Sequence, residues 1–285
     1  MDKVQRFIFD NTDVRGELVQ LDKSYQEILA ANQYPAIVAN LLGEFLVASV
    51  LLSSTIKFAG RLTLQARSQG QISLLMAEST HQQHIRGIAR VAAEITTDNF
   101  LELFVNGSMA VTIEPDKGER YQSIVPFSGT SLASCLEHYF QQSEQLNTLI
   151  KLSANAEYAS GMLVQQLPEQ RVVDPKQREE QWQHIVIIGQ TLKNTELLSL
   201  ENHQLLSRLY PHDAVRLLTH QTVSFQCSCS FERSGSALML LEADELQSLF
   251  DTTESVQTQC EFCGKTYNFN QASLTKLAHG KHKTH

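Results

Sequence analysis

The sequence lacks a long apolar run and a secretory signal. The longest apolar stretch, residues 38–52, is about fifteen residues long and is interrupted by Asn40 and Glu44. That stretch is too short and too polar to span a bilayer, so we expect a buried core helix and no membrane partner. The first six residues contain no apolar core and no small-residue cleavage site, so no signal peptide is visible. Together with reduced thiols, these absences predict a cytoplasmic protein.

Positive charge is also scarce. Lys and Arg number 23 against 31 Asp and Glu, which gives a net charge of −8. From Gln221 onward, five Lys and Arg oppose seven Asp and Glu. Because phosphate contacts need clustered Lys and Arg, we expect no nucleic acid as a partner.

Nucleotide-binding motifs are absent as well. The segment Gly264-Lys265-Thr266 resembles the end of a phosphate-binding loop, but Gln259 stands where the motif needs an earlier glycine. No dinucleotide fingerprint follows any predicted strand. ATP-driven and NAD-dependent chemistry therefore have no support, and we expect that the protein is not an enzyme. The Gly264 segment is better explained as a turn.

Four of the five cysteines gather near the C-terminal end. Cys227 and Cys229 form one close pair, and Cys260 and Cys263 form another thirty residues later. Two such pairs can supply four sulfur ligands to one tetrahedral metal ion, for which zinc is the usual occupant. The first pair is closer and the intervening loop longer than in the common ribbon spacing. Four thiolates leave no position for an activated water, which argues against a hydrolytic centre.

The same cysteines suggest a redox response. A structural zinc contributes roughly 10–16 kcal/mol to folding a small domain. Closing a loop of three or four residues with a disulfide contributes only about 1.5–2 kcal/mol. Two such bridges cannot replace the metal, so we expect that oxidation expels one zinc ion and unfolds the module. A disulfide framework in a secreted protein is the alternative, but nothing else in the sequence indicates secretion.

Periodicity predicts an α+β fold with a mixed sheet-and-helix core over residues 1–170. Helical patterns occur around residues 25–29, 38–52 and 132–140. Cys135 lies among apolar neighbours in the last of these, which indicates an inert buried thiol. Alternation of apolar and polar residues predicts strands, namely 6–10, 14–21, 61–65, 71–76, 86–91, 109–113, 121–125 and 161–167.

Composition changes after residue 170, where charge and glutamine become frequent. Asp174 before Pro175 fits a helix N-cap with proline at the first helical position. The helices expected behind it carry an apolar stripe that a flanking domain must cover. We interpret residues 171–222 as a helical linker and residues 223–285 as a small zinc domain. The linker either packs permanently on the core or is covered only while the zinc module stays folded.

Several segments together resemble the thirty-three-kilodalton redox-regulated heat-shock chaperone family along nearly the whole chain. The most specific is the pair of cysteine motifs, with one residue between Cys227 and Cys229 and two between Cys260 and Cys263. The other segments are 14–19, 46–49, 86–91, 118–122, 143–146 and 160–163, and the residues that flank the cysteines, 225–230 and 260–267.

This resemblance implies an ATP-independent holdase that is inactive while reduced and zinc-bound. It also implies that oxidation forms two disulfides, Cys227 with Cys229 and Cys260 with Cys263. The zinc module and linker would then loosen, and the protein would dimerise and hold unfolding clients for downstream ATP-dependent chaperones under stress. Two alternative functions remain open. One is a zinc-ribbon-type binding module for nucleic acid or the translation machinery, and the other is a thiol–disulfide enzyme with one exposed, low-pKa cysteine.

Overall fold

The computed structural model describes residues 2–251 and 253–281 and divides the chain into two compact units, Met1–Gln226 and Cys227–His285. Strands and helices occur in both units, as the predicted α+β class requires. The division into a core, a linker over residues 171–222 and a zinc domain from residue 223 stays a prediction.

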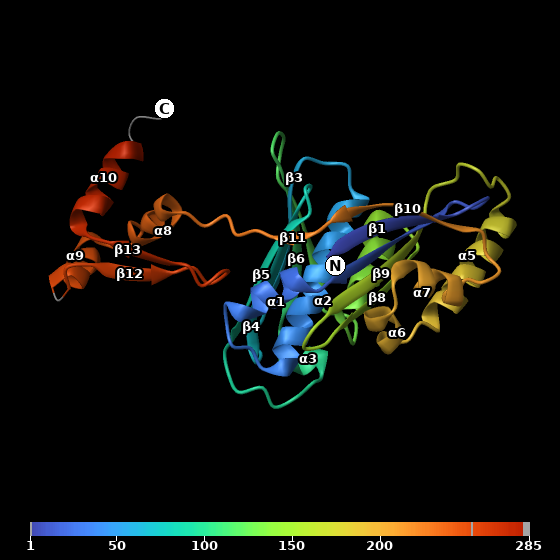
Figure 1. The fold of residues 1–285 in the computed structure, drawn as a ribbon, viewed down its shortest axis with the longest axis horizontal. Helices are drawn as coiled ribbons and strands as arrows, with labels where there is room; N and C mark the ends of the chain where they lie inside the picture. The colour runs from blue at the N-terminus through green and yellow to red at the C-terminus, as the bar shows by residue number, and fades with distance from the viewer. Residues whose placement is uncertain (1, 252, 282–285) are drawn as a thin grey trace. The chain divides into compact units, whose positions relative to one another are not determined.

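The first unit contains two sheets (Figure 1). The five-stranded sheet has the order β10 (Val215–Thr222), β1 (Lys3–Phe9), β2 (Val14–Leu21), β9 (Ala159–Gln166) and β8 (Thr148–Ala154). The six-stranded sheet has the order β11 (Ser224–Phe225), β5 (His84–Val91), β4 (Ile72–Thr80), β3 (Gly60–Arg67), β6 (Ser108–Pro115) and β7 (Tyr121–Pro126). Neighbouring strands are antiparallel except β11 and β5, which are parallel.

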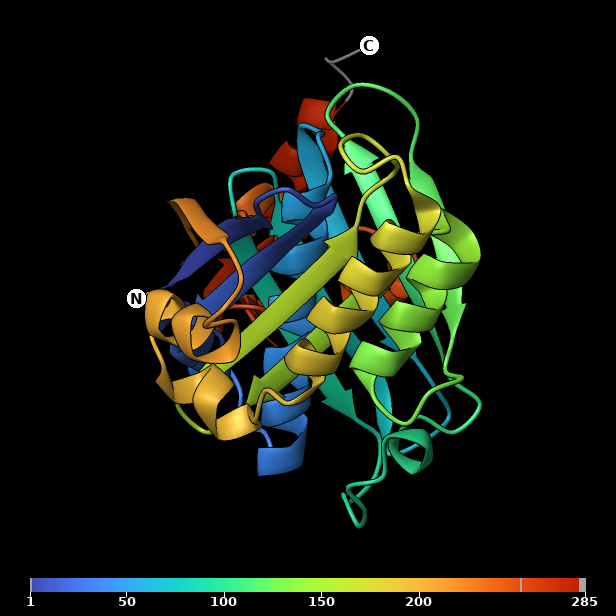
Figure 2. The same ribbon diagram turned by 90° about the vertical axis from the view of Figure 1, so that its right-hand side faces the viewer.

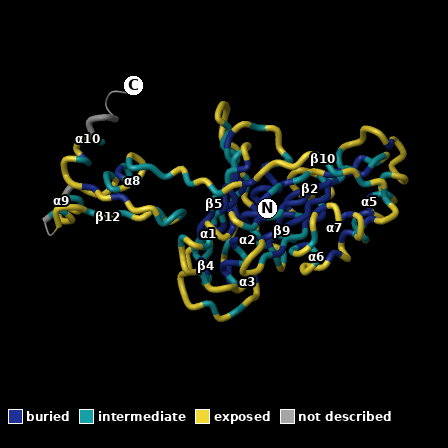
Figure 3. The backbone as a smooth tube through the Cα atoms, viewed as in Figure 1, coloured by how far each residue is buried: buried dark blue, intermediate teal, exposed yellow. Residues whose placement is uncertain are grey.

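Helix α2 (Ala36–Thr55) contacts strands of both sheets and forms the centre of the core (Figures 1 and 3). A Cβ atom at Gly43 would lie 2.8 Å from the Cβ of Ala154, so the close approach of this helix to β8 requires glycine. The helix has 20 residues and is long and apolar enough to cross a membrane, so the expectation that this stretch is too short and too polar to span a bilayer was wrong. However, 72% of its apolar window is buried inside the protein, which confirms a core helix.

Three helices cover the other face of the five-stranded sheet: α5 (Pro175–Gln190), α6 (Asn194–Ser199) and α7 (Asn202–Leu209). Figure 2 shows them in front of its strands. Asp174 caps α5 by accepting a hydrogen bond from the Lys176 N–H at 3.0 Å, with Pro175 at the first position, as predicted. One apolar cluster joins helices and sheet, and its buried members are Phe7, Phe9, Val14, Leu18, Leu149, Met162, Val164, Trp182, Ile185, Leu192, Leu197, Leu205, Leu206 and Tyr210.

The first unit also holds α1 (Lys23–Ala30), α3 (Phe100–Leu103), α4 (Leu132–Tyr139) and the π-helix η1 (Phe140–Glu144). Three of its strands differ from the expectation. Strands β8 and β11 were not predicted, and β10 ends the segment that was interpreted as helical. Because β10 is a mostly exposed edge strand, hydrogen bonds between its backbone and that of β1 stabilise it more than an alternating apolar face does.

The second unit is built from α8 (Phe231–Leu238), α9 (Ala243–Asp251), β12 (Val256–Gln259), β13 (Thr266–Phe269) and α10 (Gln271–Lys281). In the described part of this unit, the buried apolar side chains are Tyr267, Phe269 and Leu274. The Phe231 ring stacks on Phe269 with centroids 4.4 Å apart. So small a core favours additional stabilisation by a metal.

Candidate metal centre

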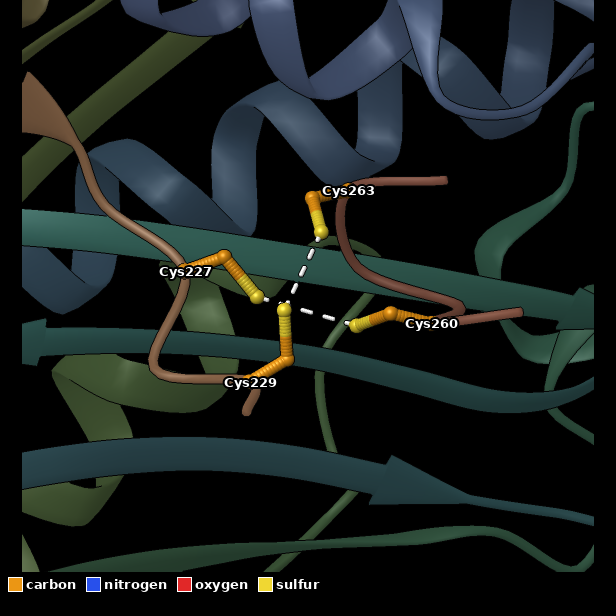
Figure 4. Close-up of side chains that lie close together, drawn as sticks. All are labelled: Cys227, Cys229, Cys260 and Cys263. Atoms are coloured by element: carbon orange, nitrogen blue, oxygen red, sulfur yellow. Dashed lines mark hydrogen bonds between the residues drawn. The ribbon is translucent and has the colours of Figure 1, made fainter. Parts of the chain in front are cut away.

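The four clustered cysteines meet at one point in the second unit (Figure 4). All four Sγ atoms lie within 4.8 Å of one another. The Sγ atoms of Cys227 and Cys260 are 3.7 Å apart, and those of Cys229 and Cys263 are 3.4 Å apart. A tetrahedral zinc with Zn–S bonds of about 2.3 Å places its sulfurs about 3.8 Å apart, whereas a disulfide needs about 2.05 Å. The four free thiols therefore have the spacing of metal ligands.

The first cysteine pair lies in the loop between β11 and α8. Ser230 caps α8 by accepting a hydrogen bond from the Arg233 N–H at 3.2 Å. The Arg233 guanidinium reaches back, and its Nη1 donates to both the carbonyl and the hydroxyl oxygen of Ser228 at 2.8 Å. These contacts fix the backbone between Cys227 and Cys229, so both thiols are held by the start of one helix.

The second pair lies in the tight turn between β12 and β13. The Gly264 N–H donates to the Cys260 carbonyl at 2.8 Å, and the Cys260 N–H donates to the Lys265 carbonyl at 2.9 Å. Gly264 has a φ of 70°, a left-handed conformation that favours glycine. Gly264 therefore closes the turn that carries this cysteine pair, as predicted, but Thr266 is already the first residue of β13. The backbone N–H of Lys265 also hydrogen-bonds to Cys263.

Burial and hydrogen bonds give the thiols of the cluster different pKa values. Burial would raise the pKa of Cys229, but hydrogen bonds from the Tyr267 hydroxyl, 3.1 Å away, and from the other thiols lower it to about 7. Burial, together with the neighbouring thiols, raises the pKa of Cys263 to about 12. Burial likewise raises the pKa of Cys227. Four thiolates so close together repel one another, and a divalent cation would offset that repulsion.

Two residues of this centre were missed by sequence reasoning, namely Tyr267 and Arg233. The signal for Tyr267 was present, since alternation in residues 265–269 places it on the same face of the strand as buried Phe269. Arg233 gave no comparable signal, because its partner Ser228 becomes a neighbour only when the cap of α8 forms. Cys135 is completely buried on α4, as predicted, and burial raises the pKa of its thiol.

A family model described as Hsp33 protein matches residues 2–270. The chain is 47% identical over 282 residues to the 33 kDa chaperonin of Pseudomonas aeruginosa strain LESB58, which covers 98% of this chain and 95% of the relative. Identity to the 33 kDa chaperonin of Pseudomonas fluorescens strain Pf0-1 is also 47%, with coverages of 98% and 94%.

A solved structure with a similar fold covers nearly the whole chain. It is the crystal structure of the 33 kDa chaperonin, a heat shock protein 33 homologue, from Thermotoga maritima. The TM-score is 0.80 at 21% identity, over 99% of each chain. The family match and the sequence relatives both extend across the four cysteines, and the structural likeness independently supports the fold. This chain therefore belongs to the Hsp33 family of chaperones.

Proposed function

We propose that this protein is a redox-regulated, ATP-independent holdase of the bacterial cytoplasm, inactive when reduced and active when oxidised. The observation that carries the proposal is the set of four free thiols at the spacing of tetrahedral ligands, in a family of chaperones. The donor set fits zinc, because soft thiolates in a tetrahedral arrangement are typical of structural zinc sites.

In the reduced state Cys227, Cys229, Cys260 and Cys263 would bind one zinc ion. When bound, zinc would join the loop before α8 to the turn between β12 and β13 through four bonds to sulfur. Tyr267 would support that arrangement by donating a hydrogen bond to Cys229. Phe231 and Phe269 would remain stacked behind the site, because the segments that carry them are held in place.

Oxidation would change which segments are joined. Each pair of thiolates, Cys227 with Cys229 and Cys260 with Cys263, would lose two electrons to one hydrogen peroxide, which takes up two protons from the solvent, giving one S–S bond and two water molecules. The cysteines would then no longer be able to hold the zinc ion, which would be released. Each disulfide then lies within its own loop, so no bond between side chains connects the two loops. Each short bridge contributes only about 1.5–2 kcal/mol, far less than the metal, and the small core of the second unit would unfold.

The active state would then expose apolar surface. Helices α5, α6 and α7 of the segment 171–222 cover one face of the five-stranded sheet with Trp182, Ile185 and their neighbours. If this segment loosens after the second unit unfolds, both the helices and the sheet present apolar surface to unfolding clients. Dimerisation of the oxidised form and transfer of clients to ATP-dependent chaperones complete the proposal.

The test is aggregation of a chemically denatured client without ATP, with the protein either reduced and zinc-loaded or oxidised by peroxide at raised temperature. We expect protection only by the oxidised form, accompanied by zinc release. Cys229→Ser should lose this switching, whereas Cys135→Ala, which removes a buried thiol outside the cluster, should retain it. Equal protection or none in both forms would refute the switch, and salt-sensitive RNA binding would then favour the binding-module alternative.

A further inference from the structure

A cavity of about 460 Å³ lies in the first unit near the C-terminal end of α2. Strands of both sheets contribute to its wall, including β2 and β9 from one sheet and β3 and β6 from the other. Most of the lining is apolar, with Leu52, Ile56, Leu62, Val111, Ile113 and Phe140 among its members. Cavities of about 300–1,000 Å³ with apolar walls and a few polar groups typically bind small ligands.

Arg15 is the cationic side chain of this lining, and its hydrogen-bonding capacity is only partly used. Its Nη2 atom donates to the Gln165 Oε1 atom at 3.0 Å and to the Thr55 carbonyl at 3.4 Å. Its Nε atom is buried and has no hydrogen-bond partner among the residues that the structure describes. A buried donor without an acceptor is unfavourable, and a ligand acceptor would relieve that cost.

The nearby carboxylates are engaged elsewhere. Glu17, two residues after Arg15, accepts hydrogen bonds from the Ser54 hydroxyl and, at 3.1 Å, from Arg6 Nε. Glu144 also lines the cavity, but it is exposed and accepts a hydrogen bond from the Tyr139 hydroxyl at 3.0 Å. Within residues 2–251 and 253–281, no carboxylate forms an ion pair with Arg15. The Glu17 charge acts on both Arg15 and Arg6, so one carboxylate is shared by two guanidinium groups. An anionic group on a ligand would supply a further countercharge and an acceptor for Arg15.

The π-helix η1 forms another part of the wall through Phe140, Ser143 and Glu144. It ends at Gln145, whose φ of 54° is left-handed. π-Helical turns are rare and frequently occur at functional sites. Here the turn places exposed Ser143 and exposed Glu144 beside the apolar lining.

We propose that this cavity binds a small monocarboxylic acid with an apolar body. The carboxylate pairs with Arg15, and the apolar body packs against the ends of α2, β3 and β6. An uncharged molecule of the same shape would gain the apolar contacts but would not pair with the Arg15 guanidinium. This ligand site is independent of the cysteine centre and of the proposed redox switch.

The probes are octanoate, below its micelle concentration, and 1-octanol, titrated calorimetrically into the reduced, zinc-loaded full chain. We expect octanoate to bind about tenfold more tightly than 1-octanol, or better. Arg15→Gln should abolish that preference while 1-octanol still binds. Because Arg15 also contacts Gln165 and Thr55, this variant is used only if its circular dichroism spectrum matches that of the parent.

A second pair of variants leaves Arg15 intact. Ser143→Trp places a bulky ring on the wall and should weaken octanoate binding about tenfold. Gln142→Trp is the matched control, since Gln142 is exposed on the same π-helix but does not line the cavity, and its octanoate affinity should be unchanged. Equal binding of both probes to the parent, or equal octanoate binding by the two Trp variants, would overturn the proposal.

Discussion

Cys229 differs from its three partners in having a side-chain hydroxyl directed at its sulfur. The Tyr267 Oη atom lies 3.1 Å from the Cys229 Sγ atom, and this hydrogen bond favours the thiolate over the thiol. A thiol with a pKa of about 7 is partly ionised at neutral pH, and the thiolate is the form that both binds metal and reacts with oxidants. The same residue is thus suited to holding zinc and to reacting with peroxide.

Replacing Tyr267 with Phe removes only the hydroxyl group and so tests whether its hydrogen bond to Cys229 supports zinc binding. The ring can still pack in the small core, but the hydrogen bond to Cys229 is lost. We expect zinc affinity, measured by competition with a chromogenic chelator, to fall about tenfold, as for other groups that orient metal ligands.

Tyr158→Phe is the control for that experiment. Tyr158 is 40% exposed in the first unit, and the loss of its hydroxyl should leave zinc affinity unchanged. If Tyr267→Phe bound zinc as tightly as the parent, the hydroxyl would have no part in holding the ligand.

At the scale of elements, α5 is fastened to the sheet by the buried carboxylate of Asp13. This side chain accepts hydrogen bonds from the backbone N–H groups of Arg171 at 2.9 Å and of Gln170 and Val172 at 3.3 Å. It also pairs with the Arg178 guanidinium in the first turns of α5. Asp13 therefore joins the end of β1 and the start of β2 to the beginning of the segment 171–222.

We expect Asp13→Asn to lower the free energy of unfolding by about 2–4 kcal/mol at pH 7, because it removes one member of a mostly buried charged pair. Urea denaturation measures this change. Asp10→Asn is the matched control: Asp10 pairs with Arg216 on the surface, where a pair contributes about 0–1 kcal/mol. If the two variants lost the same free energy of unfolding, Asp13 would contribute no more to stability than a surface ion pair does.

The contribution of the Asp13–Arg178 pair to the free energy of unfolding should depend on pH in a direction that can be worked out. Burial would raise the pKa of Asp13, but the three backbone hydrogen bonds and the Arg178 charge lower it overall. A carboxyl whose folded pKa lies below its unfolded value of about 3.9 stabilises the fold above that pH. This stabilisation disappears as the pH falls through the folded pKa. The difference between Asp13→Asn and the parent should therefore be full at pH 7 and shrink toward pH 3.

Elements with strong local signals could be predicted, and those that depend on distant partners could not. The apolar run of α2 and the cap at Asp174 each depend on residues that are close together in the sequence. The four cysteines likewise form two close pairs that can be seen in the sequence. In contrast, β10 forms because β1 offers an unpaired edge, which no local pattern reveals. The contact between Tyr267 and Cys229 likewise joins residues 38 positions apart, and Asp13 meets its partners across more than 150 residues.

At the scale of the whole molecule, the two units differ greatly in the size of their hydrophobic cores. The first is built around α2 and two sheets, and apolar clusters fill both faces of its five-stranded sheet. Within its described residues, the second buries only Tyr267, Phe269 and Leu274 as apolar side chains. A domain of this size buries only about 60% of the surface that its unfolded chain exposes. The roughly 10–16 kcal/mol that zinc would contribute at the proposed site would therefore decide whether this unit folds.

Removing the metal without any oxidant should therefore unfold the chain in a fixed order. We treat the reduced protein with a strong zinc chelator and follow limited proteolysis by mass spectrometry. Cleavage should begin within residues 227–281 and then reach 171–222, while a fragment holding α2 and both sheets up to β9 persists. Returning zinc under reducing conditions should restore the original resistance. Cleavage that begins in the segment 171–222 instead would mean that the linker opens on its own, and the zinc module would then not control the exposure of apolar surface.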